Sequence, residues 1–323
     1  AAAALGRTGF PGATARVLST GPGMAYLKVG EGCSHDCRFC TIPAIRGPHV
    51  SRTLDAIEAD ARAMLDAGAR ELVVVGQDVT AWGSDLGVKH GLERLVERLL
   101  PLPGLDWLRL MYLYPAGLTE ARLDFLAAAG PPLVPYFDIP LQHAHPEVLA
   151  AMGRPFAKDP NRVLERLHRR FAEPVKRTSL ITGYPGETDA HFRELLAFIE
   201  RWRFHHLGVF AYCAEEGTPA AELPGQVDEA LREERRERAM ALQRGISAEL
   251  LEGFVGAELD VLVERPSPEW PGLFEGRAWF QAPEVDGVTY VSASPESGRE
   301  LHPGDLVRAE VVQATEYDLS ALA

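Results

Sequence analysis

Six β-rich segments alternate with helical segments along the first two thirds of this chain, and this order restricts the folds available to it. The β-rich segments cover residues 24–30, 71–77, 107–115, 134–142, 177–185 and 206–213. The stretches between them carry apolar residues at helical spacing. Strands that alternate with helices indicate an α/β fold with a parallel sheet and helices outside it. Because there are six units where a complete TIM barrel has eight, we predict an incomplete (β/α)6 TIM-like barrel.

The last third of the chain has a different pattern. Residues 228–252 are highly charged and predict one long helix, which we interpret as a solvated linker helix. Short strand-like runs separated by turns follow, and they predict a small closed all-β barrel of the oligonucleotide-binding size class. The expected divisions are a linker remnant or leading hairpin (1–23), the α/β core (24–226), the linker helix (227–253) and the small barrel (254–323).

Three of the four cysteines, Cys33, Cys37 and Cys40, lie within eight residues. So few cysteines build no disulfide framework, and the cluster indicates metal, redox or nucleophilic chemistry. A Cys3His zinc knuckle is one alternative, but His35 lies too close to Cys33 and Cys37 to complete a tetrahedron comfortably. A thioredoxin-like pair would use Cys37 and Cys40 and would not need Cys33. Close cysteine runs are typical of iron–sulfur clusters, where three thiolates leave one of four irons open to a chelating substrate.

Composition restricts the location and the partners. No run of 18 uncharged apolar residues occurs, so we expect no membrane span. The opening AAAALGRTGF lacks the features of a signal peptide, and we expect a cytoplasmic protein. The net charge is −13, and residues 254–323 contribute −9 of it, with 13 acidic and four basic residues. Proteins bind the phosphates of nucleic acids with Lys and Arg side chains. The negative charge of this segment therefore disfavours nucleic acid as the main substrate and fits a basic protein partner.

The C-x-x-x-C-x-x-C run, with Phe39 before its last cysteine, resembles the signature of the radical S-adenosylmethionine (radical SAM) superfamily. The resemblance implies a [4Fe–4S] cluster on Cys33, Cys37 and Cys40, with S-adenosylmethionine bound at the open iron. It also implies that Phe39 lies near the adenine.

Further candidates for cofactor binding lie at or after predicted strand ends, where barrel enzymes place their ligands. They are Gly76, Gln77, Asp78, Gln142, Arg154, Gly183 and Glu187. The resemblance implies that the turn around Gln77 holds the methionine amino group. It also implies that the turn TGYPGET, which contains Gly183 and Glu187, lies near the ribose and methionine. Arg154 carries a charge that suits a cofactor or substrate carboxylate, and the catalytic residue stays unassigned.

A wider resemblance covers nearly all of residues 15–323. The runs CTIPAIRG, VVGQDVTAWG, DIPLQHAHPEVLAAMGR, ITGYPGET and AEEGTPAAEL are similar to those of radical SAM methylthiotransferases, and the small barrel resembles a TRAM domain. MYLYPAGL, QAPEVDG and EYDL are similar to the RimO branch. That branch adds a methylthio group to the β-carbon of an aspartate in small-subunit ribosomal protein twelve. The alternative is a MiaB-like enzyme that modifies transfer RNA adenosine, which an acidic barrel disfavours.

The resemblance also implies a mechanism and its partners. Reductive cleavage of S-adenosylmethionine would give a 5′-deoxyadenosyl radical that takes a hydrogen from the aspartate β-carbon, with electrons from an external donor. The acidic TRAM domain would steer the basic ribosomal protein. Complete members carry a second [4Fe–4S] cluster in an upstream domain, which handles the sulfur. This chain begins without that domain, so we expect it to cleave S-adenosylmethionine but not to deliver sulfur by itself.

Two rival interpretations stay open on the sequence. An RNA-binding protein with a structural metal knuckle would need a basic, aromatic-studded barrel. A different radical enzyme, such as a methylase, would need only one cluster.

Overall fold

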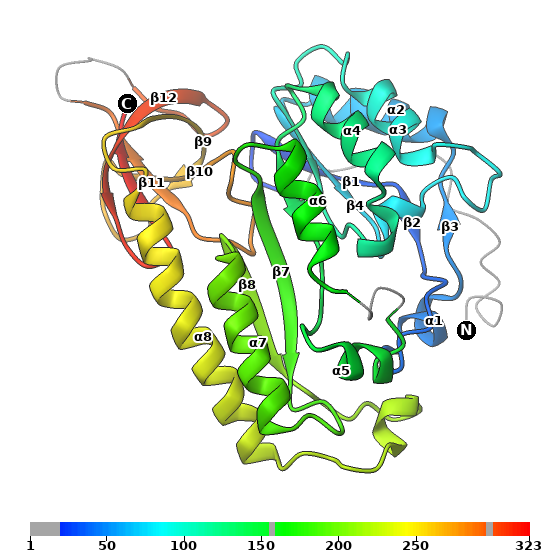
Figure 1. The fold of residues 1–323 in the computed structure, drawn as a ribbon. Helices are drawn as coiled ribbons and strands as arrows, with labels where there is room; N and C mark the ends of the chain where they lie inside the picture. Colours follow the sequence, from blue (N-terminus) through cyan, green and yellow to red (C-terminus); the bar gives the residue numbers. More distant parts are fainter. Residues whose placement is uncertain (1–19, 155–158, 295–299) are drawn as a thin grey trace.

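The computed structural model describes residues 20–154, 159–294 and 300–323, so most of the predicted leading segment 1–23 lies outside it. Six parallel strands form the first part of the chain (Figure 1). They are β1 (Met24–Lys28), β4 (Glu71–Val75), β5 (Trp107–Leu110), β6 (Tyr136–Asp138), β7 (Val175–Thr182) and β8 (His206–Ala211). Five lie within segments where the sequence predicts a strand, and β7 begins two residues before the predicted segment 177–185.

These strands form an incomplete barrel, as predicted. They form two three-stranded sheets with the strand orders β1-β4-β5 and β6-β7-β8, and neighbouring strands in each sheet are parallel. Backbone hydrogen bonds join the two halves, from Leu113 N to Asp138 O at 2.8 Å and from Val134 N to Leu108 O at 3.0 Å. Among the described strands, none pairs with both β8 and β1, so the barrel is open on that side.

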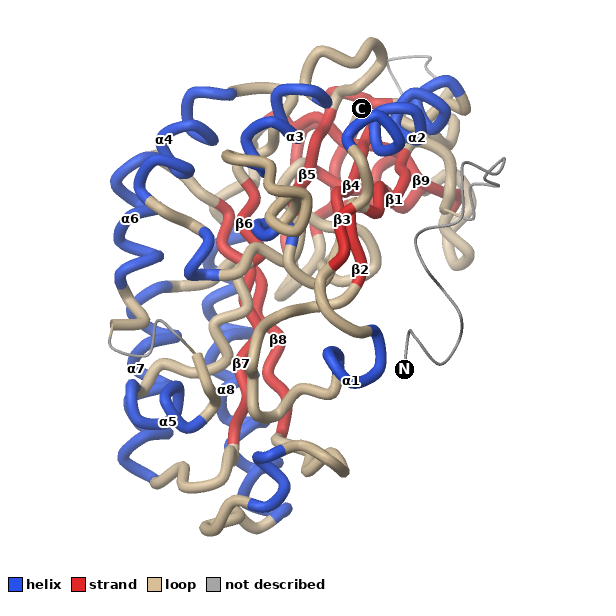
Figure 2. Tube along the Cα trace, turned by 90° about the vertical axis from the view of Figure 1, so that its right-hand side faces the viewer, coloured by secondary structure: helices blue, strands red, loops and turns tan. Residues whose placement is uncertain are grey.

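Helices cover the outer face of the strands (Figure 2). They are α2 (Leu54–Asp66), α3 (Gly91–Leu99), α4 (Glu120–Ala129), α5 (Pro146–Ala151), α6 (Arg162–Arg170) and α7 (Asp189–Trp202). The threonines before α2, α4 and α7 (Thr53, Thr119 and Thr188) each accept a hydrogen bond from a backbone N–H of the first turn. Short elements complete this part: β2 (Gly30–Glu31), β3 (Val50–Ser51), α1 (Ile42–Arg46), η2 (Val79–Ala81), η3 (Pro115–Gly117) and η4 (Pro219–Glu222).

The long helix α8 (Glu229–Glu252) forms where the sequence predicts it, but its interpretation as a solvated linker is wrong for one face. That face is buried against β8 and α7, and its buried residues are Arg235, Ala239, Gln243, Ile246, Ser247 and Leu251. Gln243 donates to Phe204 O at 2.7 Å, and Ser247 donates to His205 O at 3.2 Å. The helix therefore closes the barrel's last unit as well as leading to the next domain. Among the described helices, none combines the length and apolarity that crossing a bilayer requires.

The C-terminal part is a closed five-stranded barrel, as predicted. Its order is β10-β11-β13-β12-β9. The strands are β9 (Glu258–Pro266), β10 (Phe274–Ala278), β11 (Thr289–Ser292), β12 (Leu306–Ala314) and β13 (Leu319–Leu322). Figure 1 shows this small barrel at the end of the molecule where β7 and β8 begin.

Buried charges hold the small barrel against the first residues of the parallel strands. Glu71, at the start of β4, accepts from Arg109 at 2.7 Å and from Arg277 of β10 at 2.6 Å, and all three side chains are buried. Burial alone would raise the pKa of Glu71, but the two guanidinium groups outweigh it and hold that pKa below its ordinary value. Arg277 also pairs with Glu264 at 2.7 Å.

Asp286, from the loop between β10 and β11, makes a second buried contact with the parallel strands. Its carboxylate accepts from the Tyr136 hydroxyl at 2.6 Å and lies 3.4 Å from both Arg177 and His206. The small barrel therefore closes the floor of the half-barrel, at the end opposite the carboxyl ends of the strands.

We expect Glu71→Gln to lower the free energy of unfolding by about 3–5 kcal/mol, because buried Arg109 loses its carboxylate and buried Arg277 keeps only Glu264. The contribution of Glu71 is fully present above its unfolded pKa of about 4.3 and is lost as the pH falls through the lower folded pKa. Urea unfolding at pH 7 and at pH 3 measures both effects.

The matched control is Glu258→Gln on the same barrel. Glu258 is exposed and pairs with exposed Arg308 at 3.4 Å, so its loss changes the free energy of unfolding by at most about 1 kcal/mol. Equal effects of the two substitutions would contradict the role given to the buried pair.

Candidate metal and cofactor site

The three cysteines lie on the loop between β2 and α1, at the open end of the half-barrel. Each is half-buried. Backbone hydrogen bonds fix the loop from several sides: Cys33 N donates to Gly47 O and Cys40 N to Cys37 O, both at 3.1 Å. Arg38 N donates to Met152 O at 3.1 Å, and its carbonyl accepts from Ala220 N at 3.0 Å. Segments far apart in the sequence therefore hold one short loop.

The sulfur spacing suits a cluster better than a single metal ion. Burial raises the pKa of the Cys33 and Cys40 thiols, so holding them as thiolates requires a bound cation. A single zinc with bonds of about 2.3 Å would bring its sulfurs to within about 4 Å of one another. Within the described ranges, the three sulfurs do not belong to any set of ligand atoms that all lie within 4.8 Å of one another. The donor set fits a larger, multi-iron group.

His35 contacts a carboxylate and an aromatic ring beside the cysteine loop. Its Nε2 lies 2.7 Å from Asp78 Oδ2, and its ring stacks on Tyr114 with centroids 3.6 Å apart. A histidine that pairs with a carboxylate through Nε2 keeps Nδ1 for a metal. The described residues, however, place no set of three or more His35 and cysteine ligand atoms all within 4.8 Å of one another, as a zinc knuckle requires.

The predicted turn Gly76, Gln77 and Asp78 lies beside the cysteine loop, at the end of β4. Asp78 is buried, and its Oδ1 accepts from the backbone N–H and the hydroxyl of Thr80 at 2.8 and 2.5 Å. The side-chain oxygen of half-buried Gln77 has no hydrogen-bond partner among the described residues. A Cβ at Gly76 would meet nothing closer than 3.7 Å. The turn offers polar groups beside the loop, and its cofactor role stays a prediction.

Arg154 contacts a cysteine directly. Its Nη1 donates to Cys37 Sγ at 3.2 Å and its Nη2 to Pro140 O at 2.7 Å. The guanidinium lies over the ring of Tyr114, 4.6 Å from its centroid. The role predicted for Arg154, neutralising a carboxylate, is untested. The sequence analysis does not predict its contact with a cysteine sulfur.

Gln142 and Phe39 occupy two further sides of this end. Gln142 has a φ of 73°, an uncommon value outside glycine, and its backbone bonds Ser179 and Ile181 of β7 at 2.8 and 2.7 Å. Phe39 packs against a small apolar cluster and meets the Tyr184 ring edge-on at 6.5 Å. Phe39 is part of the cysteine loop, and the contacts of both residues with a cofactor stay predictions.

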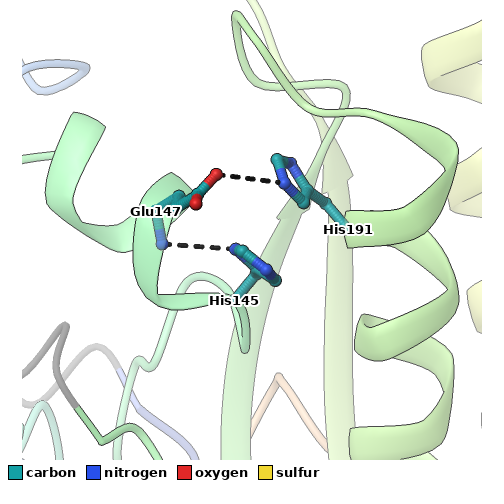
Figure 3. A group of neighbouring side chains, drawn as sticks. All are labelled: His145, Glu147 and His191. Atoms are coloured by element: carbon teal, nitrogen blue, oxygen red, sulfur yellow. Dashed lines mark hydrogen bonds and ion pairs between the residues drawn. The ribbon is translucent and has the colours of Figure 1, made fainter.

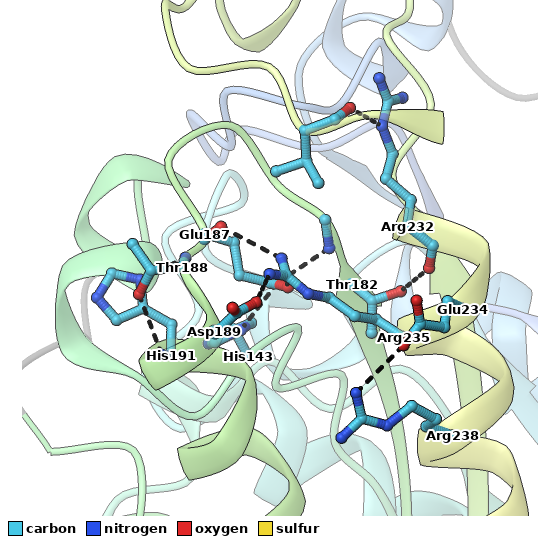
Figure 4. Close-up of polar contacts among 12 residues, drawn as sticks. His143, Thr182, Glu187, Thr188, Asp189, His191, Arg232, Glu234, Arg235 and Arg238 are labelled. Atoms are coloured by element: carbon cyan, nitrogen blue, oxygen red, sulfur yellow. Dashed lines mark hydrogen bonds and ion pairs between the residues drawn. The ribbon is translucent and has the colours of Figure 1, made fainter. Parts of the chain in front are cut away.

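Glu187, on the turn after β7, contacts Arg235 of α8 (Figure 4). Glu187 is fully buried, and it accepts from Arg235 at 2.8 Å, Gly183 N at 3.0 Å and His143 Nε2 at 3.2 Å. Gly183 has a φ of 71°, and a Cβ there would lie 2.2 Å from a side-chain carbon of Arg232. These contacts give both residues a structural role, and their predicted cofactor role is untested. The sequence analysis does not predict the contacts of the α8 arginines with this turn, because it interprets the charged helix as solvated.

Two histidines and a glutamate gather outside the cysteine loop (Figure 3). The ligand atoms of His145, Glu147 and His191 all lie within 4.8 Å of one another. However, His145 Nδ1 accepts from Glu147 N and His191 Nδ1 accepts from Thr188 N. A neutral ring that accepts at Nδ1 carries its proton on Nε2, whereas a metal-binding Nε2 needs the opposite tautomer. The Nε2 atoms therefore face Glu147 and Glu194 as donors, at 3.5 and 3.6 Å, in a histidine–carboxylate cluster.

We expect Glu187→Gln to lower the free energy of unfolding by about 3–5 kcal/mol, because buried Arg235 loses its buried carboxylate. Asp189→Asn is the matched control, since Asp189 pairs with the same guanidinium at 2.6 Å but is 79% exposed. That substitution costs at most about 1 kcal/mol. Urea unfolding measures both variants, and a larger cost for Asp189→Asn would contradict this assignment.

Comparisons with known proteins match both parts of the chain. Residues 27–199 match the radical SAM superfamily, and residues 255–323 match the TRAM domain. The ribosomal protein uS12 methylthiotransferase RimO of Nitratidesulfovibrio vulgaris is 58% identical over 308 residues, which cover 95% of this chain and 70% of the relative. The protein of the same name from Aquifex aeolicus is 43% identical over 306 residues, covering 94% of this chain and 70% of the relative.

A solved structure supports the fold alone. Coproporphyrinogen III oxidase (HemN) from Escherichia coli, a radical SAM enzyme, aligns with a TM-score of 0.53 at 18% identity. The alignment covers 70% of this chain and 53% of that protein.

Proposed function

Because this chain belongs to the RimO family of radical SAM methylthiotransferases, we propose that it acts on ribosomal protein uS12, taking the hydrogen from the aspartate β-carbon to which these enzymes add a methylthio group, with the sulfur supplied from the family's second cluster. The observation that carries the proposal is the loop with Cys33, Cys37 and Cys40 at the open end of a half-barrel whose floor is closed by a TRAM domain.

The cysteine loop is the proposed cofactor site. Cys33, Cys37 and Cys40 would hold a [4Fe–4S] cluster that, with S-adenosylmethionine on its open iron, supplies a 5′-deoxyadenosyl radical. The turn at Gln77 and the ring of Phe39 line this end of the barrel and would orient the bound cofactor. No side chain needs to act as a general base, because the hydrogen leaves an aspartate β-carbon that is too weakly acidic for one.

The TRAM domain determines from which end a substrate enters. Contacts of Asp286 and Arg277 close the floor, so the remaining access is from the cysteine loop or the open side beside β8. Two aromatic side chains are exposed there: Tyr112, just after β5, is 43% exposed, and Phe210, on β8, is 59% exposed. A protein segment, unlike a free amino acid, is long enough to reach from the outer surface to this end.

An aromatic pair on the TRAM domain, exposed Trp270 and half-buried Tyr290, supports the choice of a basic partner. Trp270 is 51% exposed, and its ring meets Tyr290 edge-on with centroids 5.8 Å apart. The pKa of Tyr290 is raised, first by burial and then by the nearby carboxylates of Asp318, Glu275 and Glu269. Aromatic faces beside carboxylates suit Lys and Arg side chains.

The charge of this surface favours a protein over RNA. Glu275 is paired with Arg265 at 2.6 Å, which leaves Glu269 and Asp318 to set the local sign. The domain as a whole carries −9. A phosphate backbone would meet repulsion there, whereas a basic ribosomal protein would be attracted.

The proposed reaction predicts hydrogen transfer from a defined atom. The chain would be reconstituted with iron and sulfide without oxygen, then given a low-potential reductant, S-adenosylmethionine and uS12 with β-deuterated aspartate. We expect deuterium in the 5′-deoxyadenosine, measured by mass spectrometry, and no 5′-deoxyadenosine from Cys37→Ala. Two results together would contradict the proposed substrate: transfer RNA stimulates formation of 5′-deoxyadenosine, and the 5′-deoxyadenosine formed with deuterated uS12 contains no deuterium.

The aromatic pair predicts a specific binding defect. We expect Trp270→Ala to weaken binding of uS12 about fivefold, which corresponds to about 1 kcal/mol for an exposed cation–π contact. Val312→Ala is the control, because Val312 is 45% exposed on the same domain but has no ring that could face a cation. Titration at two salt concentrations measures the effect, and a transfer RNA that binds more tightly than uS12 would count against a basic protein partner.

A further inference from the structure

The guanidinium of Arg154 is positioned by the end of helix α5. Met152 caps this helix, and Gly153 follows with a φ of 74°. A Cβ at Gly153 would lie 2.6 Å from the carbonyl oxygen of Asp36, so only glycine allows this turn to approach the cysteine loop so closely. Met152 O accepts from Arg38 N at 3.1 Å, next to Cys37. The backbone therefore fixes Arg154 against the cysteine loop.

Side-chain contacts then fix the direction of its N–H groups. Arg154 is 6% exposed, and its two Nη atoms donate to Pro140 O and to Cys37 Sγ. The Tyr114 ring lies against the guanidinium, and His35 stacks on the other side of that ring. A buried charged donor in a fixed orientation interacts more strongly with its acceptor than one in water.

We propose that Arg154 is a positioning residue that sets the reduction potential of the cluster through its hydrogen bond to Cys37 Sγ. The inference rests on the proposed cluster on the three cysteines. Uptake of one electron adds one negative charge to a four-iron cluster and its thiolates. A cationic N–H donor on a ligating sulfur stabilises the reduced form more than the oxidised form, so it raises the potential.

This role differs from the carboxylate contact that the sequence suggests for Arg154. A guanidinium that holds a cofactor carboxylate would change the affinity for S-adenosylmethionine and leave the cluster's own potential in its absence unchanged. The two roles therefore separate in a measurement made before S-adenosylmethionine is added.

The test is an anaerobic redox titration of the reconstituted chain with titanium(III) citrate, followed by the EPR signal of the reduced cluster. We expect a more negative midpoint potential for Arg154→Met than for the wild type. Arg38→Met is the matched control: it removes the same charge from the residue next to Cys37, but Arg38 is exposed and no hydrogen bond of its guanidinium to sulfur is present in the described structure. We expect a much smaller shift for this control.

The outcomes distinguish this inference from the proposed function. A wild-type chain that binds no four-iron cluster would refute the proposed function. A wild-type cluster with equal shifts in the two variants, or with weaker S-adenosylmethionine binding and no shift for Arg154→Met, would refute the hydrogen bond's role. If Arg154→Met does not fold, Arg154→Gln gives the same test, because it removes the positive charge while a polar side chain stays in the buried position. A neutral amide donor stabilises the added negative charge less than a guanidinium does, so a lower potential is expected and an unchanged one contradicts the inference.

Discussion

The site depends on how a short loop with three sulfurs is held in one shape. A loop of this length cannot fix itself, because its backbone groups need partners outside it. Gly47 supplies one acceptor, Met152 another, and Ala220 donates to the carbonyl of Arg38. Met152 and Ala220 lie more than a hundred residues away in the sequence, so distant segments preset the cysteine positions, which lowers the entropy cost of assembling a cluster there.

Buried charges connect the layers around this loop. Glu187 ties the end of β7 to Arg235 of α8, and Glu71 ties the start of β4 to Arg277 of the TRAM domain. Such pairs contribute little net free energy relative to apolar packing, but a mismatched arrangement leaves a charge buried without its partner. Their value here is to define one docking geometry, with the TRAM domain at the floor and the cysteine loop at the open end.

The sequence predicts the strands, the small barrel and the cysteine site because each has a local pattern. Helix α8 shows where a local pattern fails. Its buried face repeats at about every fourth residue through Arg235, Ala239, Gln243 and Ser247, but polar side chains fill most of these positions. Counting apolar residues alone therefore predicts a solvated helix. The recurrence of small or amide side chains every four residues, at Ala239, Gln243 and Ser247, is the signal in the sequence that marks the buried face. The pairing of Glu71 with Arg277, and the left-handed backbone of Gln142, have no local signal because both arise from tertiary contacts.

The central claim is that three cysteines hold a four-iron cluster with one iron open to S-adenosylmethionine. Mössbauer spectroscopy of the chain reconstituted with ⁵⁷Fe tests this claim most directly. The account predicts about four irons per chain in a [4Fe–4S] cluster, with one iron site whose spectrum changes when S-adenosylmethionine is added and loss of the cluster in Cys37→Ala. A single bound metal ion, or a cluster whose irons are all unaffected by S-adenosylmethionine, would contradict it.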